Sequence, residues 1–165
     1  MKTLFLIRHA KSSWDDSSQS DFERSLNERG LIDAPQMGIL LKSKNIIPDL
    51  IISSPANRAK TTAEIFASQL TYPNSKIQTD ERIYNASMKD LAEVVSEIDD
   101  KFDIVFLFGH NPGITNFANI IGDKPVDGMP TCAVIGIELN LASWKELDKN
   151  CGKIILAVTP KQIID

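Results

Sequence analysis

Residues 4–14 read Leu4-Phe5-Leu6-Ile7-Arg8-His9-Ala10-Lys11-Ser12-Ser13-Trp14, an unbroken apolar run that stops abruptly at Arg8 and His9. A run of this kind is typical of a strand that is buried on both faces of a sheet. In open α/β sheets, ligands bind where the strands end. The first strand therefore places two side chains that can carry positive charge at a candidate site.

Two other apolar runs end in similar residues. The run 104–108 is followed by Gly109-His110-Asn111-Pro112-Gly113, which contains the second of the chain's two histidines. The run 50–53 leads into a helix with Arg58 in its first turn and Lys60 close by. A cation in the first turn is repelled by the helix dipole unless an anion is nearby. The sequence thus directs cationic and histidine side chains to three strand ends.

The composition is that of one ordinary domain, which we expect to cover residues 1–165. Hydrophobic residues make up 42% and charged residues 24% of the chain, which argues against disorder and against a membrane protein. No signal segment precedes the first strand, so we expect a cytoplasmic protein. The formal net charge of -4 argues against a broad nucleic-acid surface. Cys132 and Cys151 lack metal-ligand spacing, and we expect reduced thiols.

Strands alternate with helices along the chain, which predicts a three-layer α/β/α sandwich with a mostly parallel sheet of about six strands. The patterns predict further strands over 50–53, 77–79, 104–108, 133–139 and 154–158, and helices over 27–44, 56–70, 87–98 and 111–122. Only a short turn or helix around Trp144 separates the last two strands, which allows one antiparallel neighbour. Residues 12–25 are expected to form a loop, and those after Pro160 a tail.

The first helix and the helix after His110 carry local signals for their ends and buried faces. Asn27 is expected to cap the first helix, and Pro35 to kink it or divide it into two pieces. Asn111 is expected to cap the later helix and Gly122 to end it. The buried face of the first helix is expected to comprise Leu31, Ala34, Met37 or Gly38, and Leu41.

The convergence of Arg8, His9, Arg58 and His110 indicates a phosphate site, although each residue alone has an ordinary explanation. An arginine can reach into water, and a lone histidine commonly lies at the surface. Together, two arginine forks and a helix N-terminus match the oxygens of a phosphoryl group. A neutral histidine can attack phosphorus and hold the group covalently. We assign that role to His9, because nearby arginines disfavour its protonated form, and expect His110 to be the cationic partner.

Three separated segments resemble the histidine phosphatase superfamily, the group that includes phosphoglycerate mutases. They are Leu-Ile-Arg8-His9-Ala-Lys-Ser, Ser53-Ser54-Pro55-Ala-Asn-Arg58-Ala-Lys-Thr-Thr-Ala and Gly109-His110-Asn-Pro-Gly. The small size and the first segment resemble phosphohistidine phosphatases of the SixA type. The resemblance implies a phosphoglycerate mutase-like fold, a phosphorylated His9, a phosphate pocket of Arg8, Arg58 and His110, and neither a metal nor another cofactor. Ala10 stands where the superfamily commonly has glycine.

Mutase-like branches of the superfamily also carry a glutamate that donates a proton. Glu81 lies in the corresponding region, and Asp15 and Asp16 lie near the first segment, but we expect all three to be solvated charges. An alkoxide leaving group needs a general acid, whereas the imidazole of phosphohistidine leaves more easily. The lack of a clear acid therefore favours phosphohistidine as substrate. Trp14 is either a packing lid at the domain edge or a wall of the site.

The sequence therefore predicts a phosphatase that removes a phosphoryl group from phosphohistidine on a protein, such as a histidine phosphotransfer domain. The alternative is a phosphomonoesterase for a small molecule such as a sugar or nucleotide phosphate. A non-catalytic module that holds a phosphorylated partner is a more distant alternative, because it would need no nucleophile. A mutase is less favoured because the chain is short and lacks a clear acid. None of these functions involves nucleic acid or a membrane.

Overall fold

The computed structural model describes residues 1–164, in which six strands and five α-helices alternate for most of the chain. The strands are β1 (Lys2–Arg8), β2 (Leu50–Ser53), β3 (Gln78–Thr79), β4 (Ile104–Gly109), β5 (Val134–Leu139) and β6 (Gly152–Val158). The α-helices are α1 (Glu28–Ser43), α2 (Asn57–Gln69), α3 (Met88–Ser96), α4 (Gly113–Ile121) and α5 (Pro160–Ile164). Short 3-10 helices cover Asn74–Lys76, Glu81–Ile83 and Trp144–Glu146. No helix within residues 1–164 is both long and apolar enough to cross a membrane.

The six strands form one sheet in the order β3-β2-β4-β1-β5-β6. β1, β2, β3 and β4 pair in parallel, whereas β5 is antiparallel to both of its neighbours, β1 and β6. The sheet is therefore mixed, with a single reversed strand, and the prediction of a mostly parallel sheet with one antiparallel neighbour is confirmed. Because β1 lies in the middle of the sheet, its end is flanked by the ends of other strands.

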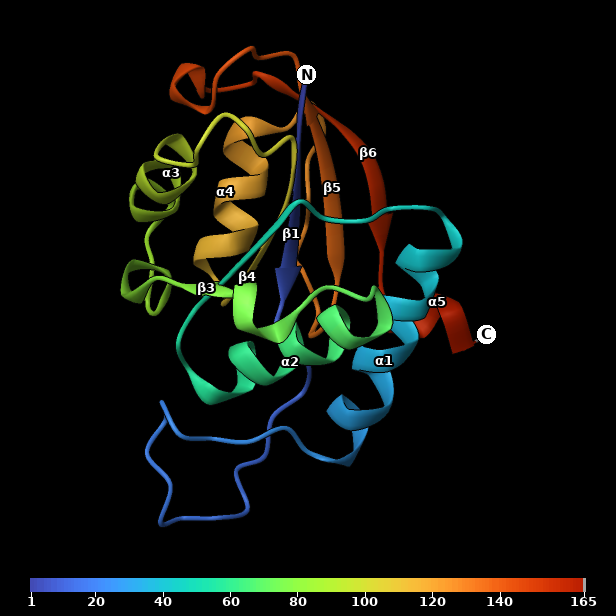
Figure 1. Cartoon of the computed structure of the whole chain (residues 1–165). Helices are drawn as coiled ribbons and strands as arrows, with labels where there is room; N and C mark the ends of the chain where they lie inside the picture. The colour runs from blue at the N-terminus through green and yellow to red at the C-terminus, as the bar shows by residue number, and fades with distance from the viewer. Residues whose placement is uncertain (165) are drawn as a thin grey trace.

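Helices cover both faces of the sheet, as the three-layer prediction requires (Figure 1). Side chains alternate across β1, so Leu4 and Leu6 pack with α3 and α4 on one face. Phe5 and Ile7 pack with α1 and α2 on the other face, where Phe66 of α2 meets Phe108 edge to edge, with ring centroids 5.1 Å apart. This burial on both faces explains why the first strand is apolar throughout.

The structure corrects two details of the sequence prediction for α1. Pro35 lies inside one uninterrupted helix, so the alternative of two pieces is excluded, while the alternative of a kink stays a prediction. Leu31 is 53% exposed, because the buried stripe begins one residue earlier, at Gly30. Adjacent residues are about 100° apart around a helix, so this shift turns Leu31 outward. The buried residues of α1 are Gly30, Asp33, Ala34, Met37, Gly38 and Leu41.

Two other predicted details differ in the structure. Asn111 does not cap α4, because its side-chain amide donates to the carbonyl of Met129 at 2.9 Å and its oxygen accepts from the hydroxyl of Thr115 at 2.6 Å. The cap position is occupied by Pro112 instead. The expected tail after residue 160 is the helix α5, which begins with a proline, a residue suited to the first helical position.

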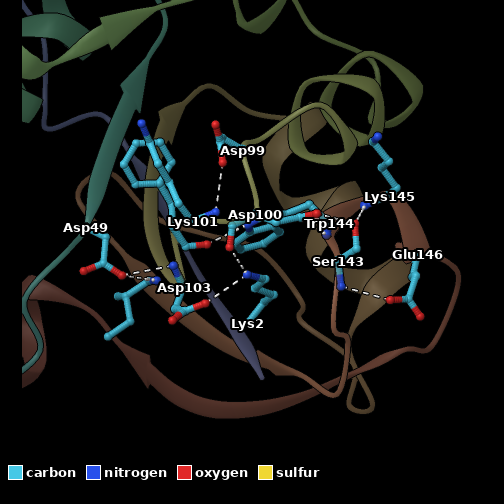
Figure 2. Close-up of polar contacts among 12 residues, drawn as sticks. Lys2, Asp49, Asp99, Asp100, Lys101, Asp103, Ser143, Trp144, Lys145 and Glu146 are labelled. Carbon is cyan, nitrogen blue, oxygen red and sulfur yellow. Dashed lines mark hydrogen bonds and ion pairs between the residues drawn. The ribbon is translucent and has the colours of Figure 1, made fainter.

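The end of the sheet at which β1 and β4 begin is closed by a polar network (Figure 2). Lys2 is only 3% exposed, and its Nζ donates to the carbonyl of Asp100 at 2.5 Å and to Oδ1 of Asp103 at 2.9 Å. Asp49 accepts from the backbone N–H groups of Asp103 and Ile104 at 3.0 and 2.9 Å. In this network the buried ammonium group of Lys2 is therefore paired with a carboxylate and a carbonyl. Unpaired cationic groups gather at the opposite end of the strands.

Gly30 fixes the position of the chain that follows β1. A Cβ atom added there would overlap the carbonyl oxygen of Lys11. We expect Gly30→Ala to displace this segment, to destabilise the fold by about 1–3 kcal/mol through overpacking, and to lower activity. Urea unfolding and turnover measure the two effects. Gly128→Ala is the control, because a Cβ at Gly128 meets nothing within 4 Å. Equal stability of the two variants would contradict this account.

Candidate active site

The ends of three parallel strands bring the four predicted residues together. β1 ends at Arg8 and is followed by His9, β4 is followed by His110, and α2 after β2 carries Arg58. The centroids of the His9 and His110 rings are 5.2 Å apart. A cavity of about 360 Å³ lies over them. Its lining comprises Arg8, His9, Lys11, Ser12, Trp14, Arg24, Arg58, His110, Asn111 and Thr131.

The hydrogen bonding of His9 determines which of its ring nitrogens can react. His9 is 6% exposed, and its Nδ1 lies 2.7 Å from the carbonyl oxygen of Ala10. A carbonyl only accepts, so Nδ1 carries the proton of the neutral ring. The lone pair is then on Nε2. Burial, together with the charges of Arg58, Arg8 and Arg24, lowers the pKa of His9 to about 4 and outweighs the opposing effect of the bond to Ala10. His9 is therefore a neutral imidazole at pH 7.

His110 is also neutral in the protein alone, so the expectation of a cationic partner was wrong. Burial, followed by the charges of His9 and Arg58, lowers the pKa of His110 to about 3. Its Nε2 lies 2.8 Å from the hydroxyl oxygen of Ser54, which also accepts from the N–H of Ala56 at 3.2 Å. Its Nδ1 is buried without a partner among residues 1–164. A bound phosphoryl dianion would favour the protonated form of this ring.

The two predicted arginines are held by backbone carbonyls rather than released to water. Arg8 donates from Nη1 to the carbonyl of Met129 at 3.0 Å. Arg58 is 6% exposed and donates to the carbonyl of Asp21 at 2.6 Å and to its Oδ2 at 3.2 Å. The alternative in which Arg58 reaches into solvent is therefore excluded. Burial and the nearby charge of Arg58 lower the pKa of Arg8, as expected for cations placed close together.

The loop between β1 and α1 supplies a third arginine that the sequence analysis missed. Arg24 is 7% exposed, and its guanidinium carbon lies 3.4 Å from the ring centroid of Trp14. Trp14 is 75% exposed and lines the cavity, so its role as a wall of the site is supported. Arg24 Nε is 3.4 Å from Oδ1 of Asp21, close enough for an ion pair but not aligned as a hydrogen bond. The sequence signal for Arg24 was weak, because it lies in a polar loop without periodicity.

Asp21 is the anion that lies among these cations, and it was also missed. Tyr84 donates to Oδ2 of Asp21 at 2.6 Å, across 63 residues of sequence. This hydrogen bond and the charges of Arg58 and Arg24 lower the pKa of the Asp21 carboxyl, while the same bond raises the pKa of Tyr84. Asp21 is therefore ionised at neutral pH. It pairs with Arg24 and Arg58 and does not serve as a proton donor.

Several nitrogens around the cavity have no hydrogen-bond partner. Within residues 1–164, the buried side-chain nitrogen and oxygen atoms without a partner are Arg8 Nε, Arg24 Nε and Nη1, Arg58 Nε and His110 Nδ1. Buried polar groups are normally satisfied, and leaving one unpaired costs about 1–3 kcal/mol. All of these nitrogens belong to residues that line one cavity. Their convergence is that of a site built to receive the oxygens of an anion.

Comparison with known families agrees with this geometry. The family model described as the histidine phosphatase superfamily (branch 1) matches residues 4–111. The chain belongs to the histidine phosphatase superfamily. The matched range contains the three strand ends and every member of the four-residue site that the sequence predicted.

Two curated relatives are longer than this chain. An uncharacterized chloroplastic protein of Arabidopsis thaliana is 30% identical over 153 residues, which is 88% of this chain and 70% of that protein. A 2,3-bisphosphoglycerate-dependent phosphoglycerate mutase of Bifidobacterium longum is 36% identical over 107 residues, or 60% of this chain. Those residues make up 44% of the mutase, so the chain matches less than half of that relative.

Solved structures within the superfamily match the whole fold. A protein of Agrobacterium tumefaciens assigned as the phosphohistidine phosphatase SixA has a TM-score of 0.79 and 25% identity, and the match covers 96% of this chain and 98% of that one. The protein histidine phosphatase SixA in complex with tungstate has a TM-score of 0.83 and 18% identity, covering 98% and 99%. The phosphoglycerate mutase-like fold and the resemblance to the SixA branch are confirmed.

The structure separates the carboxylates considered for the superfamily's proton donor from the catalytic cavity. Glu81 is exposed and does not line it. Asp15 and Asp16 are exposed loop residues, and Asp16 accepts from the hydroxyl of Ser18 at 2.5 Å. Lys60 is exposed as well and does not line the cavity. The prediction that these carboxylates are solvated agrees with their positions.

The two histidines give a direct test of the electrostatics, because the chain contains no others. An exposed histidine titrates near pH 6.5, and we expect both rings to remain neutral at pH 6 because their pKa values are lowered to about 4 and about 3. If His9 reacts as the neutral ring, activity should fall only as the pH drops toward 4. Nitrogen NMR of the two imidazoles measures their protonation as the pH is changed, and turnover measured over the same pH range gives the activity. A ring that titrates near pH 6.5 would contradict the account.

Arg24 can be tested as an anion ligand with orthovanadate, a phosphate analogue. We expect Arg24→Ala to weaken vanadate binding by roughly tenfold to a hundredfold, because hydrogen bonds to charged groups contribute about 1.5–3 kcal/mol. Arg82→Ala is the matched control, since Arg82 pairs with Asp80 and Glu97 away from the cavity. The inhibition constant of orthovanadate is measured for both variants, and equal values would show that Arg24 does not bind the anion.

Proposed function

We propose that this chain removes a phosphoryl group from phosphohistidine on a protein, through a covalent intermediate on His9. The observation that carries the proposal is the neutral His9, whose unprotonated Nε2 accompanies three buried or half-buried arginines around one cavity. Histidine nucleophiles form phosphoryl intermediates when a neighbouring group fixes their tautomer. Here the carbonyl of Ala10 does so.

In the first step, the lone pair of His9 Nε2 attacks phosphorus, and the bond from phosphorus to the substrate imidazole breaks with its electron pair left on that nitrogen. The other nitrogen of the substrate ring takes up a solvent proton before the bond breaks, so the ring departs as neutral imidazole rather than as the strongly basic imidazolate. Arg8, Arg24 and Arg58 bind the phosphoryl oxygens, on which the charge is spread in the transition state. His110 contributes its Nδ1, the buried nitrogen that lacks a partner within residues 1–164.

In the second step, water attacks the phosphorus of phosphorylated His9. The bond from Nε2 to phosphorus breaks, inorganic phosphate leaves, and His9 returns as a neutral ring with its proton on Nδ1. The hydrogen bond to Ala10 is compatible with both stages, because Nδ1 remains the donor throughout. The backbone therefore stabilises one orientation of the ring during the whole cycle.

The choice of phosphohistidine over a phosphate ester rests on the leaving group. Within the described residues, no carboxylic acid lines the catalytic cavity. Asp21 lies beside Arg58, but its pKa is lowered, so it is held as a carboxylate. An alkoxide needs a proton from a general acid, and an imidazole of modest basicity has much less need of one. The site therefore suits cleavage of a phosphorus–nitrogen bond.

A small-molecule phosphomonoesterase is the second candidate. It is favoured by the match to a phosphoglycerate mutase, a relative whose name specifies small phosphorylated metabolites. That candidate requires a proton donor, and Glu81 is the carboxylate that sequence reasoning proposed for it. Glu81→Gln separates the two functions, because it should lower ester hydrolysis sharply only if Glu81 is the acid. We expect no change from this variant on either substrate.

The proposal is tested by comparing phosphate release from a phosphohistidine-bearing protein domain with release from an alkyl phosphate. We expect a strong preference for the phosphohistidine domain, and a loss of turnover by a factor of about 10⁴ or more in His9→Ala, as is typical when a nucleophile is removed. His9→Ala should still bind orthovanadate, which shows that the cavity is intact. Preference for the ester, or turnover that survives in His9→Ala, would overturn the proposal.

A further inference from the structure

A second cavity adjoins the catalytic one and has a different chemical character. Its volume is about 470 Å³, and it shares Lys11 and Thr131 with the catalytic cavity. Three cations line it, Lys11 after β1, Arg29 on α1 and Lys161 on α5. Elements from the two ends of the chain thus place positive charge beside the site that receives the phosphoryl group.

An ion pair between exposed Arg29 and buried Asp33 is part of the lining of this second cavity. Asp33 is 5% exposed and accepts from Nε and Nη2 of Arg29 at 2.9 and 2.6 Å. Asp33 is also the lining's one carboxylate among the described residues, against three cations. The chain as a whole has a formal charge of -4, so a positive lining here runs against the average of the molecule. The cavity therefore attracts an anion.

The types of side chain distinguish between kinds of anion. The catalytic cavity holds arginines whose planar forks match a single phosphoryl group. In the second cavity the arginine fork is already bonded to Asp33, and the exposed cations Lys11 and Lys161 are flexible point charges. Pro130 and Pro160 add apolar surface. Dispersed lysines beside apolar surface suit the carboxylates of a peptide segment better than a second phosphate.

We propose, resting on the proposed function, that this cavity binds acidic side chains that lie near the phosphohistidine on the substrate protein. Lys11 is two residues from His9, which places the two sites on the order of 10 Å apart. One or two turns of a helix, at about 5.4 Å each, span that distance. The substrate class is therefore a phosphohistidine protein with Glu or Asp within about two helical turns of the phosphorylated residue.

The test uses two matched phosphohistidine peptides, one with Glu and one with Gln at the flanking positions. For the unmodified protein we expect a KM about tenfold lower for the Glu peptide, with similar kcat and with a preference that shrinks as salt is added. Lys161→Glu should remove the preference while leaving hydrolysis of the Gln peptide unchanged. Lys60→Glu is the control, because it makes the same charge change at an exposed residue that lines neither cavity.

The outcomes separate the two proposals. Equal KM values for both peptides, or a preference that persists in Lys161→Glu, would overturn the acidic-segment site while leaving the phosphatase in place. The same loss of preference in Lys60→Glu would attribute the effect to overall charge and also overturn it. Failure to hydrolyse either peptide would overturn the proposed function, and the substrate class with it.

Discussion

The hydrogen bond between His9 Nδ1 and the carbonyl of Ala10, 2.7 Å long, sets the chemistry of the site because it decides which nitrogen is free to attack. Its geometry depends on the short segment after β1, which several elements hold in place. The N–H of Ala10 donates to Thr62 of α2 at 3.0 Å, and the same hydroxyl donates to the carbonyl of Arg58 at 2.7 Å. The backbone that orients His9, the proposed nucleophile, is thus tied to the helix turn that carries Arg58. One short hydrogen-bond network therefore positions both His9 and Arg58.

The same site concentrates positive charge and unpaired donors at a cost to stability. Arg8, Arg24 and Arg58 surround two histidines, and burial is the largest cause of the lowered histidine pKa values. Asp21 offsets part of the repulsion by pairing with Arg58 and Arg24. At the opposite end of the sheet, by contrast, the buried Lys2 has hydrogen-bond partners, the carbonyl of Asp100 and the carboxylate of Asp103. An anion at the open end would supply acceptors for the nitrogens that lack them, which is the physical basis of the phosphate site that we propose.

Sequence reasoning found Arg8, His9, Arg58 and His110 because each follows an apolar run, and runs that end at one sheet edge converge in space. The fold class was predicted from the alternation of strand and helix patterns along the chain. Arg24, Asp21 and Tyr84 were not found, because they meet through side chains from a loop and from a segment 63 residues away, and no local pattern marks such contacts. The charge of His110 was mistaken because a sequence shows its neighbours in the chain but not its burial. Leu31 was misplaced because the buried face of α1 includes Gly30, which packs against the backbone of Lys11, and this tertiary contact leaves no local pattern in the sequence.

The central claim, that the neutral Nε2 of His9 is the nucleophile, is tested most directly by trapping the intermediate. The protein is mixed with a phosphohistidine substrate carrying labelled phosphorus, quenched in alkali, and digested for mass spectrometry, with phosphorus NMR to identify the isomer. The account predicts label on His9, attached through Nε2, and none on His110. Label attached through Nδ1, label on another residue, or rapid phosphate release without any trapped label would contradict it.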